Sequence, residues 1–196
     1  QIDNVRIRYF ATNNANAYAT GVDFKINGEF VKGVESWFSM SVMKTAEDLV
    51  DDFYFIDVNS DGEEIVYGYT ENDIPVETKS VEPGYIPRPT DQRFSFSLFF
   101  QDYIPKLPSF KMNISLHYAT GLPFGPPQSR NRHEATLRIP PYRRVDLGFS
   151  YHAKSAEKQL KGKNPINTFK NIWVSLEVFN LLQINNVISY VWIEDV

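Results

Sequence analysis

One short acidic stretch of the sequence has the residue types of a cation-binding loop. In DVNSDGEE, which begins at Asp57, the residues Asp57, Asn59, Asp61 and Gly62 fall at the first, third, fifth and sixth positions of an EF-hand-like calcium loop. The twelfth position is Gly68, where a bidentate glutamate is expected, and we predict no helix on either side. Asp57, Asn59 and Asp61 are therefore calcium candidates, beside the simpler interpretation that Asp, Asn, Ser and Gly form a turn.

Four tyrosines in the same acidic region could bind a ligand. Residues 45–89 hold twelve of the 24 acidic residues and only two basic ones, which predicts a solvated loop. Tyrosine offers a flat amphipathic ring that suits sugars or peptides. The substrate-binding candidates are Tyr54, Tyr67, Tyr69 and Tyr85. The alternative, that these rings pack the loop on itself, stays open.

The spacing of the histidines argues against an enzyme. His117, His133 and His152 are scattered and match neither H-x-x-H nor H-E-x-x-H, and no G-x-S-x-G or phosphate-binding glycine loop occurs. Pairs of carboxylates can be chosen from the acidic loop, but no spacing selects one pair for glycoside hydrolysis. We expect no catalytic site.

Composition excludes several classes of protein. The chain has 196 residues and a net charge of -4, which argues against nucleic-acid binding through positive charge. It contains no cysteine, so it has neither disulfides nor thiolate metal sites. The mean hydropathy is -0.35 and no apolar run is long enough for a membrane-spanning helix, whereas transmembrane strands need only be half apolar.

A period of two dominates the sequence and predicts strands. From Tyr18 to Phe30 one set of alternate residues is mostly apolar and the other mostly polar, over a length well beyond the mean strand of about five or six residues. The same alternation recurs at 93–102, 110–120, 144–152 and 172–180, and more weakly at 5–10 and 34–44. The sequence thus predicts an all-β fold of about seven antiparallel up-and-down strands.

The lengths of the connections favour a transmembrane barrel. Long connections are predicted at 45–89 and 121–140, and shorter ones at 31–34, 103–108 and 153–168. Outer-membrane barrels combine short periplasmic turns with long extracellular loops, and a tilted spanning strand needs about 9 to 11 residues. We therefore predict extracellular loops at 45–89 and 121–140, and periplasmic turns at 31–34, 103–108 and 153–168.

Three segments resemble the C-terminal barrel region of TonB-dependent outer-membrane receptors, especially those of Bacteroidetes. They are TGLPFGPP at 120–127, RIPPYRRVDLGFSY at 138–151 and WVSLEVFNLLQINNVISY at 173–190. In that family the barrel has about 22 strands around a plug, so the chain would supply roughly strands 15 to 21. The sequence contains no plug domain, no TonB box and no final strand ending in an aromatic residue, so we expect a partial C-terminal barrel domain, residues 1–196, of a longer protein.

The resemblance implies active nutrient import across the outer membrane of a Gram-negative bacterium, of a glycan, a peptide or a metal chelate. The implied partners are the plug domain of the same protein, TonB, outer-membrane lipid and, as in some relatives, a SusD-like lipoprotein. Polar residues on the strands would then face the lumen and the plug: Asp23, Lys25, Arg93, Lys111, His117, Arg144 and Asp146.

A soluble β-sandwich is the alternative, acting as a surface adhesin or a carbohydrate-binding module. It would also explain the alternation, the loops and the aromatic content. The two hypotheses differ in what covers the apolar face of the sheet. A sandwich covers it with a second sheet, and a membrane barrel leaves it to lipid.

Overall fold

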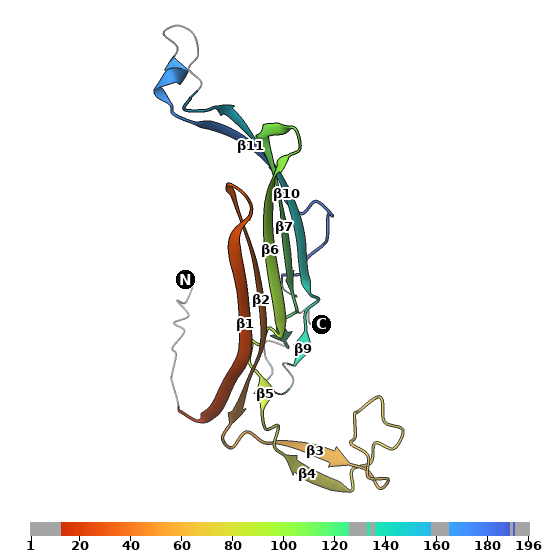
Figure 1. Cartoon of the computed structure of the whole chain (residues 1–196). Coiled ribbons are helices and arrows are strands. Elements are labelled where there is room, and N and C mark those ends of the chain that lie inside the picture. The colour runs from red at the N-terminus through yellow and green to blue at the C-terminus, as the bar shows by residue number, and fades with distance from the viewer. Residues whose placement is uncertain (1–12, 126–132, 134–135, 158–164, 189, 191–196) are drawn as a thin grey trace, which may run out of the picture.

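The computed structural model describes residues 13–125, 133, 136–157, 165–188 and 190, and one antiparallel sheet dominates it (Figure 1). The order of the long strands in the sheet follows their order in the chain. These strands are β1 (Ala15–Val31), β2 (Val34–Leu49), β6 (Phe94–Ile104), β7 (Leu107–Ala119), β10 (Tyr142–Lys154) and β11 (Ile172–Val178). The prediction of an all-β, antiparallel up-and-down sheet is confirmed.

The predicted strand at 5–10 lies outside the described residues. The seventh strand of the sheet is instead the short β5 (Ile86–Pro87), which pairs with β2. Within the described residues β1 and β11 form opposite edges and do not pair with each other. The closed transmembrane barrel therefore stays a prediction.

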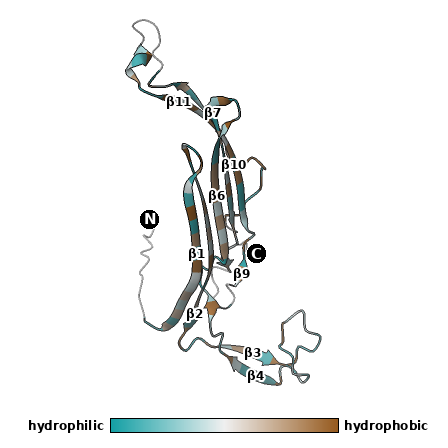
Figure 2. Ribbon diagram, viewed as in Figure 1, coloured by the Kyte–Doolittle hydropathy of each residue, from teal (hydrophilic) through white to brown (hydrophobic). Residues whose placement is uncertain are grey.

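The register of the strands gives the sheet one apolar face. Val22 lies opposite Val42, and Phe38 opposite Leu98, so the apolar set of each strand continues onto the next. Alternate residues in six ranges form this surface, which we call the apolar belt: 22–26, 38–42, 94–100, 110–118, 145–151 and 174–178. Figure 2 shows the hydrophobic residues distributed along the long strands.

The belt contributes little to a core, because none of its side chains is buried: most are partly exposed on the central strands and exposed on the edge strands β1 and β11. Val22 is 72% exposed and Leu176 is 67% exposed. The buried hydrophobic residues are few and lie mostly at the strand ends and in the connections: Val34, Ala46, Val58, Ile65 and Ile86. No helix in the described part of the chain is long and apolar enough to cross a membrane.

Because neighbouring strands run in opposite directions, alternate connections share one end of the sheet. The β2–β6 connection contains the hairpin of β3 (Tyr54–Val58) and β4 (Glu77–Val81), and the β7–β10 connection contains β8 (Pro123–Phe124) and β9 (Leu137–Arg138). We call this end the loop end, and Figure 1 shows the β3–β4 hairpin projecting beyond it. The opposite end, the turn end, carries the β1–β2 and β6–β7 turns and the 3-10 helix η2 (Pro165–Thr168).

The region predicted as a loop at 45–89 is more ordered than expected. β2 does not stop near Lys44 but runs to Leu49, since its backbone pairs with β1 throughout and with β5 near its end. Thr45, Ala46 and Glu47 are all buried there, so the alternation of polar and apolar residues is lost although the strand continues. Backbone pairing on both sides therefore sustains a strand that periodicity does not reveal.

Candidate functional site

All seven polar residues predicted to face the lumen lie on one face of the sheet, opposite the apolar belt. Asp23 and Lys25 extend from β1, Arg93 directly precedes β6, and the other four extend from the neighbouring strands β7 and β10: Lys111, His117, Arg144 and Asp146. The register brings only His117, Arg144 and Asp146 close together, because Arg144 lies directly opposite His117. The polar face thus extends over several strands, and His117, Arg144 and Asp146 form one compact group on it.

This group lines a hollow of about 210 Å³ on the polar face. Nε of Arg144 donates to Oδ2 of Asp146 at 2.9 Å, and Nδ1 of His117 lies 3.1 Å from Oγ of Ser97. Asp146 is buried, and its Oδ1 accepts the backbone N–H of Asn180 at 2.9 Å. Both oxygens of Asp146 are thus bonded to protein donors, and the carboxylate joins β10 to the segment that follows β11.

The hydrogen bond from Asn180 joins two of the segments that resemble the receptor family. After β11 the chain turns at Asn180, whose φ is 52°, and the N–H of Leu181 bonds to the carbonyl of Val145 at 2.7 Å. The side chain of Asn186 then bonds both the N–H and the carbonyl of Arg143, each at 2.8 Å. The regular pairing of β10 with β11 ends at Val178. Beyond it, the side chains of Asp146 and Asn186 hold the following segment alongside β10.

Lys111 lies nearer the turn end, in an aromatic environment. Its ammonium is 4.6 Å from the ring centroid of Trp173 and 5.1 Å from that of Tyr103. The ring of Trp173 also stacks on His152, with centroids 4.2 Å apart. These cation–π contacts hold the Lys111 side chain against the sheet.

The four candidate tyrosines do not form one site. Tyr67 and Tyr69 lie in the connection between β3 and β4, and Tyr69 is 89% exposed. Tyr85 contacts the ring of Tyr18 on β1, and Tyr54 stacks on His133 with centroids 3.9 Å apart. In the described residues no ring contact joins any two of the four. Tyr54 and Tyr85 thus contact rings outside residues 45–89, and Tyr85, Tyr67 and Tyr69 are all exposed, so the choice between substrate binding and packing stays open.

Asn59 organises the candidate calcium loop through backbone hydrogen bonds. Its side chain is buried, and Oδ1 accepts the N–H groups of Asp61 and Glu63 at 3.0 and 2.9 Å. Asp57 accepts the hydroxyl of Thr78 at 2.7 Å, and Asp61 accepts the side-chain amide of Asn72 at 3.2 Å. No group of three acidic or histidine side chains suited to a metal occurs in the part of the chain that the structure describes. The geometry is that of an Asx turn.

Asp91 is the buried charge that sequence reasoning missed. Its side chain is 0% exposed and accepts the N–H of Thr45 at 2.7 Å, Nε of Arg93 at 2.6 Å and the guanidinium of Arg138. Arg138 also donates to the carbonyl of Gly121 at 2.9 Å. Asp91 thus joins β2, the start of β6 and both long connections at one point of the loop end.

Hydrogen bonding controls the charge of this carboxylate. Burial alone raises the pKa of Asp91, but the bonds from Thr45, Arg138 and Arg93 outweigh burial and lower the pKa below its ordinary value. Asp91 is therefore ionised at neutral pH. In the sequence Asp91 lies in the segment PTDQR, and neither its neighbours nor its spacing distinguishes it from the other acidic residues.

A second feature that the sequence did not predict is a line of rings across the apolar belt. Phe24 contacts Phe38 at 6.3 Å between centroids, Phe38 contacts Phe96 at 6.4 Å, and Phe96 stacks on Tyr118 at 5.7 Å. The line crosses four strands, β1, β2, β6 and β7. Cross-strand aromatic pairs of this kind stabilise register, each by roughly 0.2–1 kcal/mol.

No protein-family model, no curated protein and no solved structure matches this chain. The resemblance to TonB-dependent receptors therefore stays a prediction.

Proposed function

We propose that this chain is part of the wall of an outer-membrane β-barrel, in the C-terminal half of a TonB-dependent receptor that imports a glycan, a peptide or a metal chelate. The observation that carries the membrane assignment is the apolar belt, which crosses six strands without one charged residue. On the same face the first charges beyond the belt are Lys44 and Arg143 toward the loop end and Asp102 toward the turn end.

The height of the belt agrees with the thickness of a bilayer core. In β7 it spans the nine residues 110–118. At a rise of about 3.3 Å per residue and a tilt of about 40°, this corresponds to a band of roughly 20–25 Å, close to the ~25 Å apolar band of outer-membrane barrels. A surface of this size, exposed and free of charge, is unfavourable in water.

The alternative of a β-sandwich lacks its second layer in the described residues. The two other sheets, β3–β4 and β8–β9, have only two strands each and belong to connections at the loop end. Neither is large enough to cover the apolar belt of six strands. Lipid is the simplest environment for this face.

The remaining elements suit the wall of a transporter. The polar face, with serines on β2, β6 and β7, would line the lumen and contact the plug domain. The long connections would be extracellular, where the exposed rings of Tyr67 and Tyr69 could contact a substrate or a SusD-like lipoprotein. The resemblance of 120–127, 138–151 and 173–190 supports the assignment to TonB-dependent receptors and to energy supplied through TonB.

Two neighbouring residues of β6 allow a direct test of the lipid-facing side. The chain has no cysteine, so Phe96→Cys and Ser97→Cys each introduce a single thiol, on the apolar and the polar face respectively. In membranes we expect the thiol at 96 to resist a charged, water-soluble maleimide, because little thiolate forms in an apolar environment, and the thiol at 97 to react with it.

The size of the labelled protein tests the second part of the proposal. A receptor barrel should migrate as a heat-modifiable outer-membrane band well above 22.6 kDa. Rapid reaction of both thiols with the charged reagent, in a protein found in the soluble fraction, would contradict the membrane assignment and favour the sandwich.

A further inference from the structure

A straight row of side chains crosses the polar face of the sheet. Each member lies directly opposite the next on the neighbouring strand, and we call the set the polar row: Asn27, Trp37, Phe99, Ser115 and Asp146. The row runs over β1, β2, β6, β7 and β10, which are consecutive in the sheet. At a strand spacing of about 4.8 Å it extends over roughly 19 Å, which is long enough for a ligand of several small rings.

Two aromatic rings lie side by side in this row, with a hollow on each side of them. The centroids of Trp37 and Phe99 are 6.2 Å apart, their planes differ by 26°, and both side chains are partly exposed. The hollow next to Trp37, which we call the β1–β2 hollow, has a volume of about 440 Å³. The hollow of about 210 Å³ that contains His117 begins at Phe99. The two rings therefore form an aromatic platform between two recesses of the same face.

The β1–β2 hollow combines this platform with hydrogen-bonding groups of both kinds. Lys25 and Asn27 offer donors, the carboxylate of Glu35 accepts, and the hydroxyl of Ser39 does both. Among the described residues neither Lys25 nor Glu35 forms an ion pair, and the side-chain amide of Asn27 has no protein partner. One positive and one negative charge balance each other, so the hollow selects neither an anion nor a cation.

We infer that the polar row binds a neutral oligosaccharide, which makes a glycan the imported substrate. The inference rests on the proposed function, because a transporter wall presents its polar face to the passing substrate. A sugar ring has a flat face of C–H groups and a rim of hydroxyls. The C–H face would pack on Trp37 and Phe99, and the hydroxyls would bond to Lys25, Asn27 and Glu35, the combination of apolar surface and few polar groups that is typical of ligand sites.

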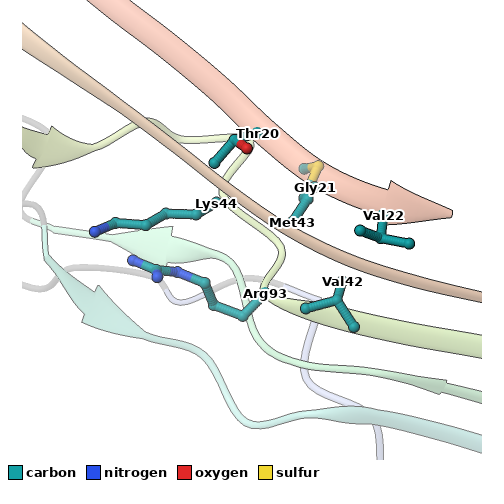
Figure 3. A pocket seen from close by; sticks show the side chains of 7 residues that line it. All are labelled: Thr20, Gly21, Val22, Val42, Met43, Lys44 and Arg93. Atoms are coloured by element: carbon teal, nitrogen blue, oxygen red, sulfur yellow. The ribbon is translucent and has the colours of Figure 1, made fainter.

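A larger hollow near the loop end does not have this combination. Figure 3 shows the residues that line it, and its volume is about 510 Å³. None of these lining residues is aromatic, so the hollow has no platform for a sugar ring. The register also places Lys44 on the side of the apolar belt and Arg93 on the polar face, where Arg93 is bonded to Asp91.

Trp173 is a second tryptophan on the polar face, but its ring already has partners. The ammonium of Lys111 lies 4.6 Å from its centroid, and the ring stacks on His152 with an interplanar angle of 3°. Trp173 is also outside the polar row, because it lies opposite His152 near the turn end. It therefore provides a matched control for Trp37.

The test measures binding of four neutral hexasaccharides to the protein that carries this chain, purified from membranes in a detergent without a sugar headgroup. Isothermal titration calorimetry would use maltohexaose, cellohexaose, xylohexaose and mannohexaose. We expect at least one of them to bind, and we expect Trp37→Ala to weaken its binding about tenfold, because aromatic anchors dominate contacts of this kind. Trp37→Phe should retain most of the binding, and Trp173→Ala should leave it unchanged.

Failure of all four hexasaccharides to bind would overturn the oligosaccharide site. Equal binding by the parent protein and Trp37→Ala, or an equal loss in Trp37→Ala and Trp173→Ala, would overturn it as well. The proposed function is decided separately by the thiols at 96 and 97, since resistance of the thiol at 96 to the charged maleimide supports the membrane wall even when no sugar binds. Heat modifiability of each tryptophan variant verifies its fold.

Discussion

At the scale of single residues, buried polar groups hold the loop end together. Asp91 is the strongest example, because one carboxylate accepts bonds from a backbone N–H and from two arginines. Asn59 has the same role within the β3–β4 connection, where one amide oxygen accepts two N–H groups. Both residues thereby hold backbone segments in place through side-chain hydrogen bonds.

We predict that Asp91→Asn loosens both long connections. The substitution leaves Arg93 and Arg138 without their counter-charge, and because these side chains are 40% and 31% exposed the cost should lie below the roughly 3 kcal/mol of a fully buried pair. Limited proteolysis of the connections measures the effect, and it should accelerate in the variant. Asp57→Asn is the control, because Asp57 is bonded in the β3–β4 hairpin and not to the sheet. Unchanged cleavage in Asp91→Asn would show that the connections are held by other contacts.

The same residue predicts a dependence on pH. Since the pKa of Asp91 is lowered in the folded protein, its stabilisation is complete above the ordinary aspartate pKa of about 3.9, and it is lost as the pH falls through the lower folded value. In the parent protein, the resistance of the long connections to cleavage by pepsin, a protease active in acid, should therefore fall as the pH is lowered. In Asp91→Asn this acid-dependent step should be absent.

At the scale of elements, alternation predicted most of the sheet and local hydrogen bonding produced the rest. The six long strands follow the period of two, because the apolar belt requires an apolar residue at every second position. The end of β2 and the turn at Asn180 were not predicted. The first is sustained by backbone pairing on both sides, and the second depends on the side chains of Asp146 and Asn186, whose contacts join residues distant in the sequence.

The candidate site was predicted less completely than the sheet, for the same physical reason. Periodicity assigned seven polar residues to one face, but only the register shows that His117, Arg144 and Asp146 are neighbours. Asp91 had no signal because its burial depends on Arg138, which is far from it in the chain. Composition likewise cannot reveal that Tyr54 and Tyr85 pack against other rings.

We predict that Gly121→Ala disturbs the base of the β7–β10 connection. A Cβ atom at this position would clash with the carbonyl oxygen of Ile139, so the end of β9, with Arg138, would have to move away from Asp91. We expect a loss of roughly 1–3 kcal/mol, as for other overpacked sites.

Gly28→Ala is the control for this prediction, because no atom lies within 4 Å of the Cβ that it would add. Urea unfolding monitored by tryptophan fluorescence measures both variants. Equal stability of Gly121→Ala and the parent protein would show that β8 and β9 pack less closely than the structure indicates.

At the scale of the whole molecule, the two faces of the sheet differ in polarity. The apolar belt is exposed on one side, polar side chains cover the other, and β1 and β11 have open edges in the described residues. Open edges favour pairing with other strands, which agrees with a sheet that is one part of a larger barrel.

We predict opposite sensitivities of the two faces to charge. Leu98→Arg places a cation in the middle of the belt and should destabilise the lipid-embedded protein by about 2–4 kcal/mol, whereas Ser97→Arg, on the polar face, should have a much smaller effect. Urea unfolding in lipid vesicles compares the two variants. Similar stabilities would argue against lipid contact at β6.

The anchoring of both long connections at Asp91 has a consequence for sequence change. The Asp91 carboxylate holds Thr45, near the end of β2, and Arg93, directly before β6, and it also holds Arg138 from the other connection. With the roots fixed in this way, we expect the residues between Leu49 and Ile86 to tolerate replacement as one unit. A segment of different length could be inserted there while β2 and β6 keep their register.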